Sequence, residues 1–125
     1  MEDEHDMATK RTQARLSAYE RRYRALAEQL ADIGYIASGS VASRYNQCGK
    51  SNCACHHDPP KLHGPYWRWT AKIDGKTVNR RLSEREVHLY NEWIANDRHV
   101  RNLLSQMRAV AAKAAELILS EDPNA

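Results

Sequence analysis

Three cysteines and one histidine lie close together near the middle of the chain. Cys48, Cys53, Cys55 and His63 supply three thiolates and one imidazole, the ligand set that a tetrahedral zinc ion prefers in closed structural sites. Glycines and a Pro-Pro pair in the same stretch favour sharp turns that fold a loop back on itself. The sequence therefore predicts a structural Zn²⁺ site with these four residues as ligands.

Two other histidines of the loop compete for the fourth ligand position. His56 and His57 follow Cys55 directly. A ligand only two residues beyond Cys55 would strain the shell, whereas His63 has room to fold back. The spacing also differs from the common C-x2-C zinc fingers and is less diagnostic than they are. Spacing alone leaves open whether His57 replaces His63.

Catalysis is not expected from this loop. A shell closed by four protein ligands leaves no position for a catalytic water, and the H-x-E signature of the zinc deaminases is missing. The chain shows no Ser/His/Asp set, no Gly-rich phosphate loop and no paired carboxylates near the cysteines. The sequence predicts that the protein is not an enzyme. The competing interpretation of the cysteines is three free thiols in a reducing compartment.

Composition predicts a small cytoplasmic protein. The chain has 125 residues, and no apolar run approaches the roughly 18 residues of a membrane span, so no membrane partner is expected. Its start, MEDEHD, is acidic, the opposite of a signal peptide. Clustered cysteines without an export signal favour a metal site over disulfides.

A helical pattern precedes the loop. An acidic lead-in over residues 1–8 is expected to be disordered. Apolar residues then recur every three or four positions from about Thr9 to Ile33, and Gly34 ends the helix. This seam consists of Leu16, Tyr19, Tyr23, Leu26, Leu30 and Ile33.

Three short strands are predicted around the loop. Ser40–Asn46 leads into it, and two alternating segments, residues 66–73 and 76–82, flank an Asp-Gly pair that is typical of a hairpin turn. Pairing Ile73 with Lys76 sets the register. The hairpin then has one largely apolar face, with Trp67, Trp69, Ala71, Ile73, Lys76, Val78, Arg80 and Leu82, and one polar, basic face, with Arg68, Thr70, Lys72, Thr77, Asn79 and Arg81.

A second, longer helix should follow the hairpin. Ser83 and Glu86 form a capping box, and the helix is expected to continue to about Leu119. Its surplus length over the first helix suggests a homodimer through the helices. Asp97 interrupts its seam and is expected to mark the end of the pairing with the first helix or to set its register. The predicted seam is Tyr90, Trp93, Asp97, Val100, Leu104, Met107, Ala111, Ala114 and Ile118.

These elements predict an α+β fold in which a zinc-stapled, three-stranded antiparallel sheet lies between two long helices that pair as an antiparallel coiled coil. The expected segments are a disordered acidic lead-in (1–8), an N-terminal helix (9–34), the zinc loop and β-module (38–82), a C-terminal coiled-coil helix (83–119) and a disordered tail (120–125).

Positive charge is concentrated in the predicted β-module. Residues 40–82 carry eight Lys or Arg against two acids, whereas residues 83–125 carry five against seven. A basic sheet face is where a polyanion would dock. The predicted nucleic-acid-binding residues are Arg44, Lys50, Arg68, Lys72, Lys76, Asn79 and Arg81.

The loop and its flanks resemble a family of small, uncharacterised bacterial proteins. The shared pattern is C-G-K-x-x-C-x-C, here residues 48–55, followed by H-G-P-Y, here residues 63–66, and later by a D-G-K-T turn at residues 74–77. The resemblance covers roughly residues 38–105. It implies His63 as the fourth ligand and an occurrence largely in actinobacteria and near mobile elements, without an assigned activity.

Two functions are expected from these features. The first is a zinc-stabilised nucleic-acid-binding accessory or regulatory protein, with DNA as the expected target and the sheet face as the contact surface. A fold-level analogy with the small arm domains of tyrosine recombinases favours it. The alternative is a coiled-coil dimerisation or adaptor protein that recruits a recombinase or transposase without itself contacting DNA.

Overall fold

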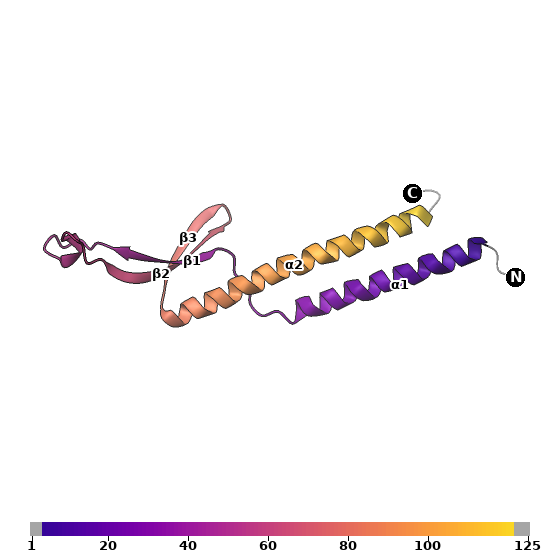
Figure 1. Cartoon of the computed structure of the whole chain (residues 1–125), viewed down its shortest axis with the longest axis horizontal. Helices are drawn as coiled ribbons and strands as arrows, with labels where there is room; N and C mark the ends of the chain where they lie inside the picture. Colours follow the sequence, from indigo (N-terminus) through magenta and orange to yellow (C-terminus); the bar gives the residue numbers. More distant parts are fainter. Residues whose placement is uncertain (1–3, 122–125) are drawn as a thin grey trace. The chain divides into compact units, whose positions relative to one another are not determined.

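The computed structural model describes residues 4–121 and shows an α+β chain (Figure 1). Two helices flank a three-stranded antiparallel sheet in the chain. Residues 1–3 and 122–125 lie outside the described residues, and with them parts of the predicted disordered ends. The elements in order are α1 (Glu4–Ala31), β1 (Ser40–Asn46), a short 3-10 helix η1 (Ala54–His56), β2 (His63–Ile73), β3 (Lys76–Leu82) and α2 (Glu84–Glu121).

Several element bounds differ from those predicted. The helix α1 begins at Glu4, inside the predicted lead-in, and ends at Ala31. Strand β2 begins at His63, three residues before its predicted start at Tyr66. The bounds of β1 and β3 agree with the prediction. Neither α1 nor α2 is long and apolar enough to cross a membrane.

The chain forms two compact units, to each of which α2 contributes one part. We call residues 4–33 with 98–121 the helical unit, and residues 34–97 the sheet unit. The extra length of α2 relative to α1 was predicted to serve a partner chain. Its first part instead packs on the sheet, so that the surplus length is used within the chain.

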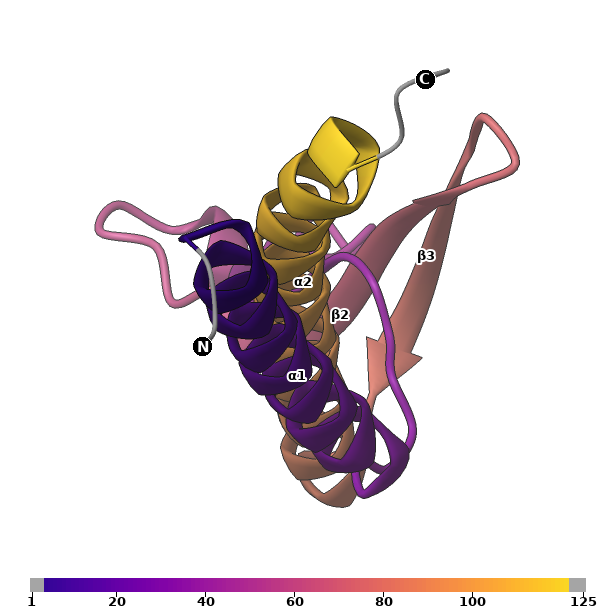
Figure 2. The same cartoon turned by 90° about the vertical axis from the view of Figure 1, so that its right-hand side faces the viewer.

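The helical unit is an antiparallel pair of helices. In it, α1 and the second part of α2 lie side by side (Figures 1 and 2). Leu26 of α1 forms a buried apolar cluster with Leu103 and Met107 of α2, and the Arg22 guanidinium donates a hydrogen bond of 3.1 Å to the side-chain oxygen of Gln106. Burial of Leu26 and of Leu103 stabilises the helical unit by roughly 2 kcal/mol for each side chain.

The buried stripe of α2 differs from the predicted seam by one position. Leu103 is 2% exposed, and Leu104 and Val110 pack half-buried on the same cluster. The predicted seam included Leu104 but not Leu103, and it ran on through Ala111, which is exposed. Met107 belongs to both stripes. Leucines at both 103 and 104 satisfy a 3/4 spacing equally well, so periodicity could not choose between them. Valine at 110 offers more apolar surface than alanine at 111, which favours the observed stripe.

The sheet has the strand order β1-β2-β3, and its hairpin register agrees with the prediction. Ile73 pairs with Lys76 and Trp67 with Leu82. The turn between them places Asp74 at φ 51° and Gly75 at φ 78°. A two-residue hairpin turn with positive φ at both positions matches the twist of the strands, which explains the Asp-Gly pair.

One face of the sheet forms the core of the sheet unit. Trp69, Ala71 and Leu82 are buried against Val87 of α2. Tyr90 stacks near Trp69 with ring centroids 4.8 Å apart, and Val41, Trp67, Val78 and Ile94 pack around this cluster. The apolar face that alternation produces on the strands thus packs against the first three turns of α2.

The predicted capping box positions these turns. The backbone N–H of Glu86 donates to the Ser83 hydroxyl (3.2 Å), and the backbone N–H of Ser83 donates to the Glu86 carboxylate (3.1 Å). The other carboxylate oxygen of Glu86 accepts a 2.8 Å bond from Arg80. The start of α2 is therefore tied to β3 by one carboxylate.

Candidate metal centre and sheet surface

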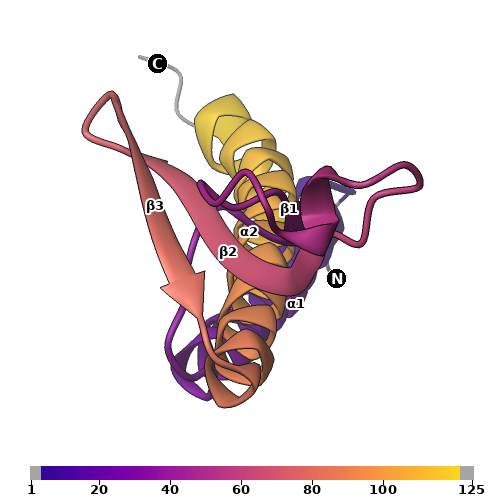
Figure 3. The ribbon, with the colours of Figure 1, turned by 90° about the vertical axis from the view of Figure 1, so that its left-hand side faces the viewer.

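The loop between β1 and β2 folds on itself through backbone hydrogen bonds (Figure 3). Its two turns are closed by Cys53 N–H donating to the Lys50 carbonyl (3.1 Å) and His56 N–H donating to the Cys53 carbonyl (3.0 Å). The carbonyl of Ala54 also accepts a bond from Lys61 N–H. These contacts draw residues distant in sequence back toward the ends of the strands.

The four predicted ligands meet in this loop. One ligand atom each from Cys48, Cys53, Cys55 and His63 lies within 4.8 Å of every other. The Cys53 Sγ to His63 Nε2 distance is 3.2 Å, and the Cys48 Sγ to Cys55 Sγ distance is 3.6 Å. Sulfur atoms about 2.3 Å from a tetrahedral ion lie about 3.8 Å apart, so the residues fit a metal ion. The cluster can hold one.

A bulge in the sheet brings His63 to the cluster. Arg44 pairs with Tyr66, but Asn46 pairs with His63, so β2 has one more residue than β1 in this interval. A bulge re-aims the side chain beside it. Gly64 lies there at φ 131°, and a Cβ on it would stand 2.7 Å from the Arg44 carbonyl oxygen. Only glycine fits this turn without strain.

The thiols are not equivalent. Hydrogen bonds from the Cys55 backbone N–H, and then from the Cys55 and Cys48 thiols, lower the pKa of the Cys53 thiol to about 6. Burial raises the pKa of Cys55, which is 0% exposed, although the Cys48 N–H donates to its sulfur at 3.3 Å. A metal ligand must be a thiolate, so the lowered pKa of Cys53 favours metal binding, whereas the raised pKa of buried Cys55 opposes it until the ion compensates its charge.

The rival histidines are outside the cluster. The ring Nε2 of His56 lies 2.8 Å from the Cys48 carbonyl oxygen, so this ring supports the loop backbone. Neither His56 nor His57 belongs to the ligand group, and both are exposed. Among the described residues, no other set of three His, Cys, Asp or Glu is close enough to hold an ion.

The face of the sheet away from α2 is basic. Arg44, Arg68, Lys72 and Arg81 are exposed there, and Arg68 stands directly opposite Arg81. Cross-strand pairing also places on this face Ser40, Ala42, Tyr66, Thr70, Thr77 and Asn79. None of these ten described side chains is acidic.

Two of the seven predicted nucleic-acid-binding residues are not on this face. Lys76 pairs with Ile73, which places it on the opposite, largely apolar face. Lys50 lies in the metal loop, outside the strands. The other five, Arg44, Arg68, Lys72, Asn79 and Arg81, lie together on the basic face.

The comparison with protein families supplies the context for both sites. A family model described as "Domain of unknown function (DUF6788)" matches residues 16–94. The chain belongs to this family. Neither the curated proteins nor the solved structures contain a match to it.

The DUF6788 match includes the metal cluster and the whole sheet, but it ends within α2, before the second part of the helical unit. It also begins further toward the N-terminus than the resemblance expected over residues 38–105. The matched region therefore includes the residues of both candidate sites.

Sequence reasoning missed two features of the DUF6788 sheet surface. The guanidinium of Arg81 lies over the ring of Tyr66, 4.3 Å from its centroid. Beside it, Ala42 and Thr70 line a hollow of about 280 Å³ together with Arg44, Arg68 and Asn79. The predicted register of β2 and β3 already puts Tyr66 on the same face as Arg68 and Arg81, but it pairs Arg81 with Arg68 and so did not reveal the contact with the Tyr66 ring. The hollow required the alignment of β1 with β2, beside which the bulge lies.

Proposed function

We propose that the protein is a nucleic-acid-binding module whose sheet is held by a structural zinc ion, and that DNA is its target. The observation that carries the proposal is the basic face. Arg68 and Arg81 stand directly opposite each other, a like-charge arrangement that costs stability. An anion between them would reverse that cost. Phosphates are the anions that rows of exposed arginine and lysine bind.

Zinc suits the donor set at the cluster. Three thiolates and one imidazole form a closed tetrahedral shell, the usual composition of structural zinc sites. A closed shell favours a structural role over catalysis, which is why we propose no enzymatic activity. When bound, the ion supplies cross-linking of the loop and compensates the charge of buried Cys55.

The metal and the basic face are connected through the strands. Arg44 lies four residues before Cys48, and Arg68 follows His63 along β2. The loop joins these two strands at the end where Arg44 pairs with Tyr66. Metal binding would therefore fix the spacing of the arginines on β1 and β2.

Fluorescence anisotropy with a labelled oligonucleotide tests this proposal. The zinc-loaded protein should bind at about 50 mM salt, and its affinity should fall as salt rises because each phosphate contact releases a counterion. The variant Arg68→Gln should weaken binding and flatten the salt dependence. Arg108→Gln removes the same charge from an exposed position on α2 and should behave as the wild type.

Two results would refute the proposal. One is the absence of binding to any DNA or RNA at low salt by a folded, zinc-loaded sample. The other is equal loss of binding in Arg68→Gln and Arg108→Gln, because net charge rather than the sheet face would then account for retention.

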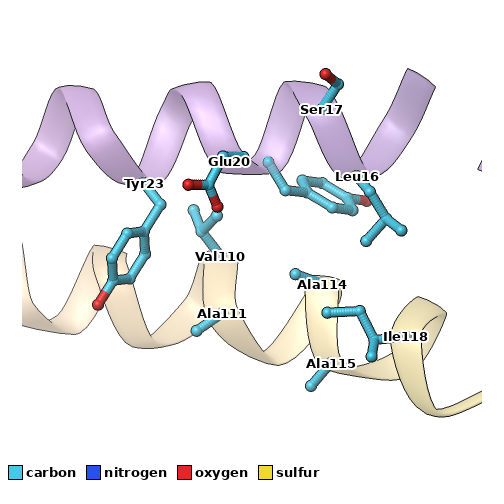
Figure 4. A pocket seen from close by; sticks show the side chains of 10 residues that line it. Leu16, Ser17, Glu20, Tyr23, Val110, Ala111, Ala114, Ala115 and Ile118 are labelled. Carbon is cyan, nitrogen blue, oxygen red and sulfur yellow. The ribbon is translucent and has the colours of Figure 1, made fainter. Parts of the chain in front are cut away.

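A second candidate function is self-association through the helical unit, as expected of an adaptor that recruits a recombinase or transposase. A hollow of about 560 Å³ lies between α1 and α2. Leu16 of α1 and Ala114 and Ile118 of α2 line it (Figure 4). The small side chains of Ala111, Ala114 and Ala115 leave this space unfilled. Ile118 and Leu119 remain 55% and 59% exposed.

A second copy of the chain is the occupant to test, since the exposed apolar residues and the groove lie on the same helices. Light scattering at micromolar concentration should then give twice the chain mass, and Ile118→Lys should give a monomer. A wild-type monomer would remove this candidate and leave the nucleic-acid proposal unaffected.

A further inference from the structure

The basic face contains an aromatic stacking group as well as cations. Tyr66 lies on the same face of β2 as Arg68, and Arg81 of β3 covers its ring at 4.3 Å. The Tyr66 ring is half-buried, and Arg81 is exposed. Tyrosine rings and guanidinium planes both provide surfaces on which unpaired bases stack.

A concave anion site adjoins this stack. The hollow has the small side chain of Ala42 among its lining, with Arg44 and Arg68 beside it. The Thr70 hydroxyl donates a 2.8 Å bond to the Asn79 side-chain carbonyl, which fixes that amide and leaves its N–H groups for a ligand. Two guanidinium groups, an amide donor and no acid are the chemistry that binds a phosphodiester.

The stacking group and the anion site are neighbours along one strand. Tyr66 and Arg68 are two residues apart on the same face, so their attachment points are separated by about 6.6 Å. A base on Tyr66 or Arg81 and a phosphate between Arg44 and Arg68 would therefore belong to the same short stretch of nucleic acid.

A duplex cannot use both parts of this arrangement. In a double helix the flat faces of the bases are covered by their neighbours, so only phosphates and base edges are available to a sheet. An unpaired strand exposes base faces and backbone together.

We propose that this surface binds single-stranded nucleic acid, with a base stacked at Tyr66 and Arg81 and a phosphodiester in the hollow beside Arg44 and Arg68. This inference rests on the proposed function and specifies its ligand. It makes the Tyr66 ring a binding group in its own right, supported by the metal cluster, whose predicted ligand His63 lies three residues before it on β2.

Competition between strand forms tests it. Zinc-loaded protein is titrated into a labelled 12-nucleotide single strand of mixed sequence, as DNA and as RNA, and into the matching duplex. The single strand should bind about tenfold more tightly than the duplex. Tyr66→Leu should reduce single-strand affinity by about tenfold through lost stacking, while leaving the salt dependence unchanged.

Matched variants separate stacking from charge and from folding. Tyr66→Phe keeps the ring and should bind as the wild type, which assigns the effect of Tyr66→Leu to the ring and not to the hydroxyl, while an unchanged circular dichroism spectrum of Tyr66→Leu excludes a loss of fold. Tyr35→Leu changes an 81% exposed tyrosine outside the basic face and should have no effect. Arg68→Gln should instead lower the slope of log affinity against log salt by about 0.7 on single strands.

The outcomes distinguish this inference from the function on which it rests. Tighter binding of the duplex, or equal affinities of Tyr66→Leu and Tyr66→Phe, would overturn single-strand recognition and leave nucleic-acid binding standing. Failure to bind any of the three oligonucleotides would overturn both.

Discussion

The two units of the chain differ in the type of side chain that is most completely buried. In the helical unit, Leu26 and Leu103 are only 1% and 2% exposed. In the sheet unit the buried apolar side chains remain 5 to 8% exposed, and among its described residues the one fully buried side chain is Cys55. The helical unit therefore has an apolar centre, whereas the most enclosed group of the sheet unit is a candidate metal ligand.

This difference explains how so few residues support a sheet. A three-stranded sheet covered by part of one helix buries little apolar surface. A metal ion can replace a missing core, because its binding energy is folding energy when the site does not exist in the unfolded chain. The helical unit has no such cluster among its described residues and must depend on packing.

Loss of the metal ion should therefore produce the largest difference between the two units, because the sheet unit should lose its structure and the helical unit should keep it. Cys55→Ser deletes the buried ligand, and structural zinc contributes about 10 kcal/mol or more in small metal-dependent folds. We expect loss of the bound ion and of the dispersed tryptophan signals of Trp67 and Trp69, with helical circular dichroism largely retained. Elemental analysis and NMR measure these changes.

A histidine in the same loop provides the control. His57→Ser should retain one ion per chain, because this ring lies outside the ligand group. Loss of the ion in His57→Ser but not in His63→Ser would show that the wrong histidine has been assigned. An intact sheet signal in metal-free Cys55→Ser would show that the sheet unit does not need the ion.

Much of the sheet unit could be predicted because its signals are local. The Asp-Gly pair requires positive φ at two positions, and once Ile73 and Lys76 are paired, alternation assigns every residue of β2 and β3 to a face. The ligand types and the glycines beside them likewise predict a metal cluster. Lys76 was placed with the nucleic-acid contacts in spite of that register, and its position opposite Ile73 removes it.

The rest depended on contacts that sequence periodicity does not determine. Leu103 was left out of the predicted seam because Leu104, which packs half-buried on the same cluster, fits the same spacing. The early start of β2 at His63 was missed because a bulge, and not alternation, extends the strand there. The hollow beside Ala42 required the alignment of β1 with β2, which the same bulge determines.

The helical unit should be sensitive to its apolar centre. Leu26→Ala removes a side chain that is 1% exposed and should lower the free energy of unfolding by about 3 kcal/mol through lost burial and a residual cavity. Leu119→Ala, at a position that is 59% exposed, should cost less than about 0.5 kcal/mol. Urea denaturation followed by circular dichroism measures both. Equal effects would contradict the assignment of the core.

A backbone change should act on the sheet unit alone. Gly39 has φ 94°, and a Cβ on it would lie 2.2 Å from the Thr70 carbonyl oxygen. Gly39→Ala should therefore destabilise the start of β1 by about 2 kcal/mol from backbone strain, with a further cost from the clash. Gly49→Ala is the matched control, since a Cβ there meets nothing within 4 Å. Hydrogen exchange of the β1 amides reports the difference.

The smallest expected effect comes from the carboxylate that ties α2 to the sheet. The backbone N–H of Ser83, then Arg80 and the Ser83 hydroxyl, lower the pKa of Glu86 below its ordinary value. A lowered folded-state pKa means that the stabilisation is fully present above the unfolded pKa, near 4.3, and is lost as pH falls through the folded pKa.

Glu86→Gln isolates this contribution. The wild type should be more stable than Glu86→Gln at pH 7, and the gap between their urea midpoints should close as the pH falls below 4. Acid also protonates the metal ligands, but this loss is common to both proteins and cancels in the gap. Glu84→Gln, in the same first turn of α2, controls for the charge at the helix start. A gap that stays constant over the whole acid range would mean that Glu86 stabilises the start of α2 by packing and not by its charge.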